Sequence, residues 1–281
     1  MKRFVATSWR SASRILVISI ALVIAITAVA TAHDMFLRAD RYFVSPQSDV
    51  LVRLINGEFG VSENSIVRSR VRDASFAGSR ARIPIDMDTW TETGDTTTFK
   101  VHVGARGTYA IGVSTRPSII ELKADEFNTY LKDDGIPDVL ADRQKSKELD
   151  KPSRERYHKH VKTLIQVGDS LSASYGAEFG YPAEIIPLNN PYSLKAGGTF
   201  RIRAKVSGKP VANQFVLFGG KTAAGGEIAA RSARTRADGT LSIPLPTAGE
   251  WYVKFINMVP YRGPEKINYE SKWATLTFEI R

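Results

Sequence analysis

Two regions of the chain consist of short β-prone segments separated by glycine-containing turns, and this pattern limits the fold more than any other feature. TTTFKVHVGARG belongs to the first region, and GTFRIRAKVSG and GEWYVKFINMV belong to the second. In TFKVHVG, the apolar residues Phe99, Val101 and Val103 alternate with polar ones, as on a strand with one buried face. The pattern predicts a mainly β chain with two β-sandwich domains, at residues 33–120 and 183–281.

The intervening residues 121–168 are rich in charges and helix formers, which predicts a short helical segment between the two sandwiches. Gly135 is a suitable end for a first helix, and Pro137 is a suitable start for a second. A third helix is predicted after Pro152. Its apolar positions share one helical face: Tyr157, Val161, Leu164 and Ile165.

Residues 1–32 have the pattern of an export signal. A basic leader is followed by an apolar run from Ile15 to Ala30, shorter than the roughly 20 residues that span a bilayer. The small residues Ala30-Thr31-Ala32 then suit cleavage after Ala32. The expected location is the periplasm. An uncleaved inner-membrane anchor is the alternative, and it would leave the domains in the same compartment.

Charge and cysteine content exclude several classes of protein. The formal net charge of +10 includes the basic leader, and the remaining Lys and Arg residues are scattered rather than clustered with aromatic residues. We therefore expect no nucleic-acid partner. The chain has no cysteine, so neither a thiol nucleophile nor a lipid-anchored cysteine is available.

His33 would become the first residue after the predicted cleavage. Its α-amine and its imidazole could then hold one metal ion together, because both groups lose their protons near neutral pH or under competition from a metal. Two nitrogen donors suit nickel, copper or zinc. The alternative is a solvent-exposed histidine that is there by accident.

Three other histidines could complete such a site. On the predicted third helix, His158 and His160 would point about 200° apart and could not share a metal, although on a strand they could. Each would border the apolar stripe of that helix. His102 is expected on the polar face of its strand, in the same domain as His33. Ordinary surface positions are the alternative for all three.

No motif points to catalysis. The chain lacks a Gly-x-Ser-x-Gly elbow, and KDDGIPD lacks the alternating ligands and final Glu of a calcium loop. GGKTAAGG lacks the spacing of a phosphate-binding loop. We therefore predict a protein that is not an enzyme. A copper enzyme with an N-terminal histidine is a minor alternative.

Several segments together resemble a family of exported bacterial proteins of unknown function, described as NikM-like or as periplasmic components of cobalt and nickel transport. These segments are AHDMFL, ADEFNTYLKDDGIPDVLADR, RERYHKHVKTLIQVGD, EIIPLNNPYSLKAGG, GEWYVKFINMVP and ESKWATLTFE. The resemblance implies a non-catalytic, metal-linked accessory protein with β-sandwich domains of immunoglobulin-like or transthyretin-like type. It implies that His33, Asp34 and His160 match residues of that family. It also leads us to expect a histidine where this chain has Asn257, whose oxygen is a poorer ligand for nickel or copper.

These observations predict a periplasmic protein that binds nickel or cobalt, with copper as a further possibility, and that supports uptake by a membrane transporter. The predicted metal ligands are His33, His160 and His102. The alternative function is a recognition or structural module of the cell envelope, in which the sandwiches bind a glycan or a protein without a metal. The sequence gives no oligomeric state.

Overall fold

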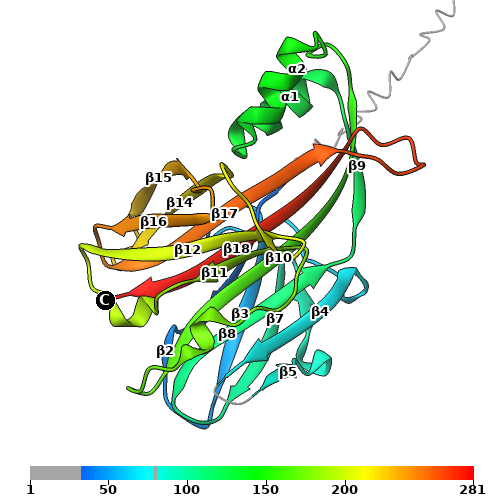
Figure 1. Cartoon of the computed structure of the whole chain (residues 1–281). Coiled ribbons are helices and arrows are strands. Elements are labelled where there is room, and N and C mark those ends of the chain that lie inside the picture. The colour runs from blue at the N-terminus through cyan, green and yellow to red at the C-terminus, as the bar shows by residue number, and fades with distance from the viewer. Residues whose placement is uncertain (1–32, 79–80) are drawn as a thin grey trace, which may run out of the picture.

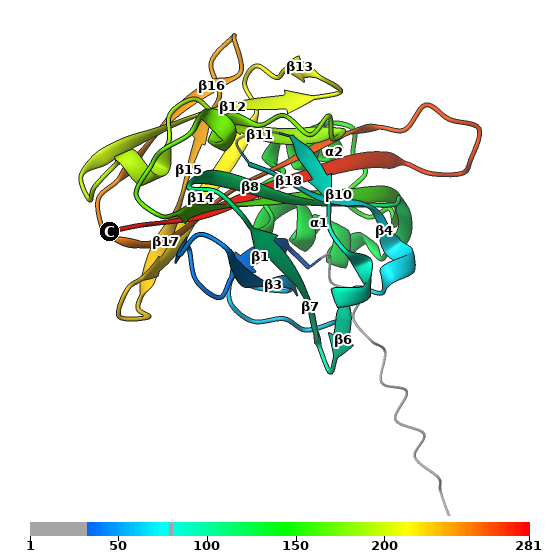
Figure 2. The ribbon, with the colours of Figure 1, turned by 90° about the horizontal axis from the view of Figure 1, so that it is seen from below.

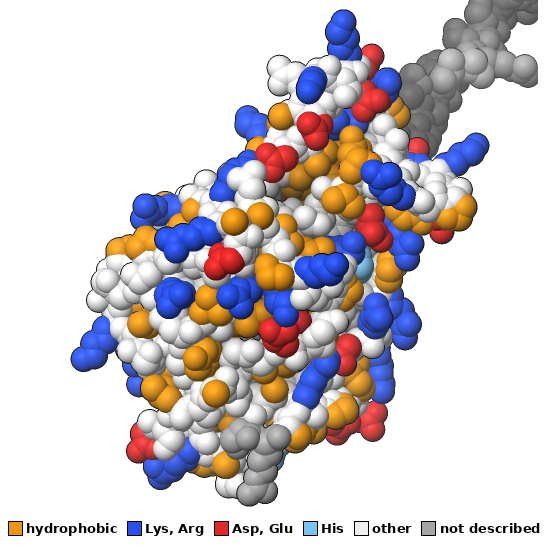
Figure 3. Space-filling model, in the orientation of Figure 1, with side chains coloured by type: hydrophobic (Ala, Val, Ile, Leu, Met, Phe, Trp, Pro, Cys, Tyr) orange, Lys and Arg blue, Asp and Glu red, His pale blue; other side chains and the backbone are white. Residues whose placement is uncertain are grey.

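The computed structural model describes residues 33–78 and 81–281, and the predicted signal peptide at residues 1–32 lies outside this range. The described chain is mainly β, as predicted, with two α-helices and three sheets arranged in layers (Figure 1). Within this range, no helix is long and apolar enough to span a membrane. Lys and Arg side chains are spread over the face shown in Figure 3, among apolar and uncharged ones.

The first sheet contains only N-terminal strands, and all of its pairs are antiparallel. In sheet order, its strands are β1 (Met35–Ala39), β3 (Ser48–Asn56), β7 (Thr96–Val103) and β6 (Thr91–Thr93). In β7, Phe99, Val101 and Val103 are buried while Lys100 and His102 are exposed. The predicted alternation is therefore confirmed.

The second sheet is the largest and runs through the middle of the molecule. Its main path is β15 (Glu227–Arg234), β14 (Phe215–Thr222), β17 (Gly249–Pro260), β18 (Tyr269–Ile280), β10 (Ser153–Val167), β8 (Gly107–Thr115), β4 (Val71–Ala77) and β5 (Arg82–Pro84), while β2 (Phe43–Val44) and β9 (Ser118–Leu122) also pair with β10. Strands β10 and β18 are parallel neighbours. The boundary predicted between the two β regions therefore does not separate two sheets, because strands from both regions join in this one.

The third sheet covers part of one face of the central sheet. It contains β11 (Ala183–Pro187), β12 (Gly198–Val206), β13 (Lys209–Pro210) and β16 (Thr240–Leu245). One apolar core fills the space between this sheet and strands β14, β17 and β18. A second core lies between the first sheet and strands β4, β8 and β10. Figure 2 shows the resulting three layers, with the third sheet above the central sheet and the first sheet below it.

The helical segment is shorter than predicted. Helix α1 (Ala124–Asp133) ends just before Gly135, which has φ +77°, and α2 (Pro137–Lys145) begins at Pro137, so both predicted boundaries are confirmed. The two helices pack on the central sheet through a third apolar core that includes Ile256, Met258 and Trp273. The other helical elements are short 3-10 turns at Arg68–Arg70, Met87–Thr89, Ala173–Gly176 and Pro191–Ser193.

The predicted third helix is wrong, because residues Ser153–Val167 form strand β10. All ten residues from His158 to Val167 are buried, since β10 has protein layers on both faces. A strand buried on both sides lacks the simple apolar and polar alternation of a half-exposed strand. The tertiary layers therefore outweigh the local preference for helix.

Candidate functional site

His33 lies two residues before the start of β1, on the face of the central sheet that the first sheet covers. β1 crosses this face, and the hydroxyl groups of Thr275 and Thr277 on β18 donate hydrogen bonds to the carbonyl oxygens of Met35 and Leu37. The first described residues are therefore fixed against the last strand of the chain.

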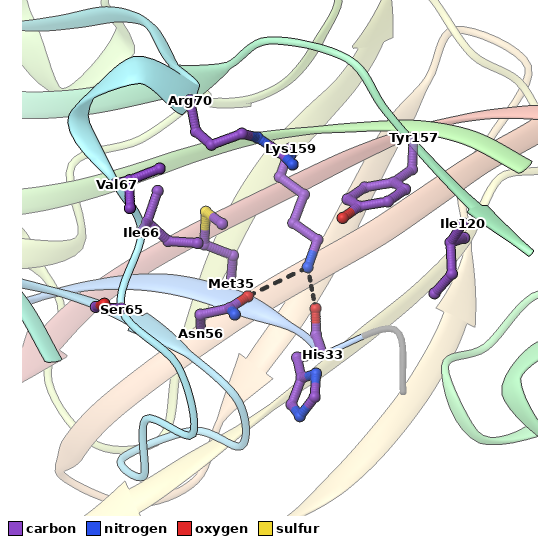
Figure 4. Close-up of a pocket in the computed structure, with 10 residues that line it drawn as sticks. All are labelled: His33, Met35, Asn56, Ser65, Ile66, Val67, Arg70, Ile120, Tyr157 and Lys159. Atoms are coloured by element: carbon purple, nitrogen blue, oxygen red, sulfur yellow. Dashed lines mark hydrogen bonds between the residues drawn. The ribbon is translucent and has the colours of Figure 1, made fainter. Parts of the chain in front are cut away.

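A pocket of about 230 Å³ opens beside His33 (Figure 4). Its lining residues come from the N-terminal segment and β1, from the end of β3 and the following loop with its 3-10 turn, and from strands β9 and β10: His33, Met35, Asn56, Ser65, Ile66, Val67, Arg70, Ile120, Tyr157 and Lys159. No carboxylate is among them. The Nε of Arg70 is buried without a hydrogen-bond partner among the described residues, and its guanidinium lies 5.6 Å from the centre of the Tyr157 ring.

The His33 imidazole is held by one carboxylate. Its Nε2 lies 2.5 Å from Oε2 of Glu63, and the His33 side chain is 16% exposed. Glu63 is fixed in turn because its backbone N–H donates to the carbonyl oxygen of Asn56 at the end of β3. When Nε2–H donates to Glu63, the ring is the tautomer whose second nitrogen, Nδ1, is unprotonated.

Lys159 holds the backbone of His33. Its ammonium donates to the His33 carbonyl oxygen and lies 3.4 Å from Oδ1 of Asn56, as the dashed lines in Figure 4 show. The side chain is only 4% exposed. Burial lowers the pKa of Lys159 to about 8, and the carboxylates of Asp34 and Asp134 limit this fall. The amine therefore still carries its charge at pH 7.

A buried ion cluster fixes the residue after His33. Lys254 of β17 donates both to Asp34 and, at 3.2 Å, to Oδ1 of Asp134, the residue that caps the C-terminus of α1. Burial, followed by the nearby charge of Asp34, raises the pKa of Asp134 to about 6. Burial alone would lower the pKa of Lys254, but the two carboxylates together raise it. The N-terminal segment is therefore tied to both β17 and α1.

His158 and His160 lie on the opposite face of β10 from Lys159, because side chains alternate along a strand. Their ring centroids are 4.9 Å apart, with an edge-to-face angle of 78°. Nδ1 of His160 lies 2.9 Å from Oγ of Ser114 on β8. The helix prediction that kept these two rings apart is therefore wrong, because both rings lie on one face of a strand.

The three predicted ligands do not form one site. His33 and His160 are on different faces of β10, and His102 is on β7, where its Nδ1 lies 2.9 Å from Oδ1 of Asp49. The His102 side chain is 63% exposed. Across residues 33–78 and 81–281, no three His, Cys, Asp or Glu side chains are grouped so that they could hold a metal ion.

Asn257, where the resemblance implies a histidine, also lies away from His33. It is in register with Lys272 of β18, which is in register with His158 of β10. Paired residues of neighbouring strands point to the same face, so Asn257 shares the face of His158. Its side-chain amide donates to Oε1 of Gln214 at 3.0 Å.

Sequence reasoning missed Glu63, Lys159 and Lys254. Asp134 lies in the segment KDDGIPD, which lacks the pattern of a calcium loop, and its partner is a lysine. A signal for Lys159 was present, because Val161, Thr163, Ile165 and Val167 recur at every second position and favour a strand. That spacing places Lys159 on the face opposite the two histidines.

Comparison with known proteins finds one family. The model of the family described as "Domain of unknown function (DUF4198)" matches residues 30–258. No curated protein matches.

Two solved structures of adhesion proteins show a distant similarity. A tetra-tandem repeat from the extending region of a large adhesion protein has 9% identity and a TM-score of 0.23, with 89% of this chain and 50% of that chain covered. The Escherichia coli adhesin FdeC has 12% identity and a TM-score of 0.22, with 87% and 63% covered. The chain thus spans less than two thirds of either structure.

Proposed function

We propose, for a chain that belongs to the DUF4198 family of unknown function, that the protein is a periplasmic accessory that binds nickel or cobalt through His33. Copper is a further candidate for the same ligands. The bound ion would be passed to a membrane uptake system. The observation that supports this proposal best is the 2.5 Å contact between Nε2 of His33 and Glu63.

The contact has the geometry of a carboxylate that orients a metal-binding histidine. Histidines that bind metals usually donate their second ring N–H to a carboxylate, which fixes the tautomer and the ring orientation. In the tautomer with the proton on Nε2, Nδ1 is the nitrogen that would bind the ion. If cleavage occurs after Ala32, the α-amine of His33 lies on the same residue, and the amine and Nδ1 can close one chelate ring around the ion.

The neighbouring residues fix the backbone of this chelate. Lys159 holds the His33 carbonyl oxygen, and Lys254 holds Asp34. The positive charge of Lys159 disfavours a cation nearby, whereas Asp34 supplies a compensating negative charge. Oδ1 of Asp34 is buried and has no hydrogen-bond partner among the described residues. It can balance the charge of the α-amine or of a bound ion.

Two nitrogen donors leave the coordination of a divalent ion incomplete. Nickel and cobalt take further ligands, which water or a partner protein can supply. An incomplete site favours exchange over storage, because an incoming ligand can enter without first displacing a protein side chain. This property suits a protein that passes a metal to a transporter.

The test compares two forms of the mature protein by calorimetry with nickel, cobalt and copper(II). One form begins at His33, and the other carries one extra alanine before it. We expect the extra residue to remove most of the binding, because it moves the free amine away from the ring.

Glu63→Gln should weaken binding by roughly 10- to 100-fold. The exposed His102→Gln variant is the matched control and should bind as the parent does. Equal affinity of the two N-terminal forms would remove the amine from the site and refute the proposal.

A further inference from the structure

The pocket beside His33 is lined by two cations and by no acidic side chain (Figure 4). The cations are Arg70 and Lys159. Burial lowers the pKa of Lys159, and the nearby charge of Arg70 acts in the same direction, whereas Asp34 and Asp134 act against both. The charge of Lys159 is therefore partly balanced by carboxylates outside the pocket, while the charge of Arg70 repels it.

Arg70 is held in place without a hydrogen-bond acceptor for its Nε. Its backbone N–H donates to the Val67 carbonyl oxygen at 2.9 Å, and its own carbonyl oxygen accepts from the N–H of Arg116 at 2.7 Å. Nε is buried and has no partner among the described residues. The Tyr157 ring, 5.6 Å from the guanidinium, offers a cation–π contact but no such acceptor. Because buried polar atoms almost always have partners, this nitrogen requires an acceptor from outside the described residues.

The size and the remaining wall of the pocket limit what that acceptor can belong to. Met35, Ile66, Val67 and Ile120 give the wall an apolar part. The volume of about 230 Å³ is below the roughly 300 to 1,000 Å³ of pockets for drug-sized ligands. It exceeds the volume of about 150 Å³ that is sufficient for benzene in an apolar cavity. The pocket therefore suits a molecule of about the size of a benzene ring that carries one small polar group.

We propose that this pocket binds a small organic carboxylate, held by the Arg70 guanidinium at one end and by the apolar wall at the other. A carboxylate matches the planar fork of an arginine with two parallel hydrogen bonds, one of which can engage Nε. The positive charge of Lys159 adds to the attraction, because charges interact more strongly away from bulk water. The site needs no metal, so it is separate from the ion proposed at His33.

Two other classes of anion fit the pocket less well. A free amino acid carries an ammonium group, which would find no carboxylate in the lining. Inorganic phosphate could pair with Arg70 but would leave the apolar part of the wall without a partner. The combination of one unpaired arginine with an apolar wall therefore favours a carboxylate that has a hydrocarbon body and no amine.

The test is a calorimetric titration of the metal-free protein that begins at His33 with benzoate, at pH 7 in a buffer without carboxylates. We expect one equivalent of benzoate to bind. Benzamide has nearly the same shape without the charge, and it should bind at least about 10-fold more weakly. Inorganic phosphate should not displace benzoate.

Variants of one 3-10 turn provide the matched comparison. Arg70→Gln should weaken benzoate binding by roughly 10- to 100-fold, and Arg70→Lys, which keeps the charge but not the fork, by roughly 10-fold. Arg68 is on the same turn, but its side chain is 57% exposed, lies near Asp88 and does not line the pocket. Arg68→Gln should therefore bind benzoate as the parent does. Near-ultraviolet circular dichroism checks that each variant is folded.

Methionine methyl resonances show where benzoate binds. Met35 lines the pocket and Met87 does not, so benzoate should shift the carbon-13 methyl signal of Met35 and leave that of Met87 in place. The inference is overturned if benzoate does not bind, if benzamide binds equally well, if phosphate is preferred, or if Arg68→Gln loses as much affinity as Arg70→Gln. The benzoate titration contains no metal, and the metal titrations contain no carboxylate, so the two proposals can fail separately.

Discussion

Glu155 provides a quantitative test of the buried charges around the N-terminal segment. Its side chain is completely buried on the helix side of β10, where Ser271 and Tyr130 donate hydrogen bonds to Oε1. Oε2 has no partner among the described residues. Burial raises the pKa of Glu155 to about 7, although the two donors and Lys159 act in the opposite direction.

The sign of the pH dependence follows from this shift. The folded chain holds the Glu155 proton more tightly than the unfolded chain does. The associated stability is complete below the ordinary value of 4.5 and is lost as the pH rises through 7. A rise in pKa from 4.5 to about 7 corresponds to about 3 kcal/mol between the two protonation states. Between pH 4 and pH 7.5, the wild type should therefore lose about 3 kcal/mol relative to a variant that cannot ionise.

Glu155→Gln is that variant, because glutamine keeps the shape and the accepting oxygen of the protonated acid. Urea unfolding of both proteins at several pH values gives the difference in free energy of unfolding. Other titrating groups are common to both proteins and largely cancel. The variant should gain on the wild type by about 3 kcal/mol as the pH rises from 4 to 7.5. A difference that stays constant, or that changes in the opposite direction, would refute the burial argument.

Two further predictions concern a buried ion pair between two layers and a close backbone contact within the central sheet, and both can be measured by chemical denaturation. Lys162→Met leaves Glu184 buried without its partner at 3.1 Å, and should cost about 3 to 5 kcal/mol. The pair of Lys205 with Glu178, whose carboxylate side chain is exposed, is the control, and Lys205→Met should cost less than about 1 kcal/mol. Similar losses in the two variants would contradict this reasoning. Gly220→Ala should prevent normal folding, because its methyl group would overlap the Glu250 carbonyl oxygen, and a normal unfolding midpoint would show this contact to be wrong.

Local sequence patterns predicted the elements that have one solvent-facing side. β7 shows its alternation directly, and Gly135 and Pro137 mark the helix boundaries through their own backbone preferences. β10 could not be recognised in the same way, because its polar residues have buried partners far away in the sequence. Lys162 pairs with Glu184, and the composition of the neighbouring sequence does not reveal such a distant partner. The charged residues of β10 therefore led to the prediction of a surface helix.

The candidate site was predictable only in part. The position of His33 after a small-residue motif identified it as a candidate, and nothing local connected it with Glu63, which lies in a loop after β3. The prediction that His33 and His160 belong to one metal site is wrong for a geometric reason. A wrong secondary structure for β10 removes the information on which face each side chain occupies, and that face decides which residues can meet.

The contact between β1 and β18 has a consequence for the order of biosynthetic events. Thr275 binds the carbonyl oxygen of Met35, so this contact joins residues separated by 240 positions in the chain. Pairings of such long range form slowly and cannot form before the ribosome has added the last strand. A nascent chain of this kind therefore lacks its complete fold until its last strand has been synthesised.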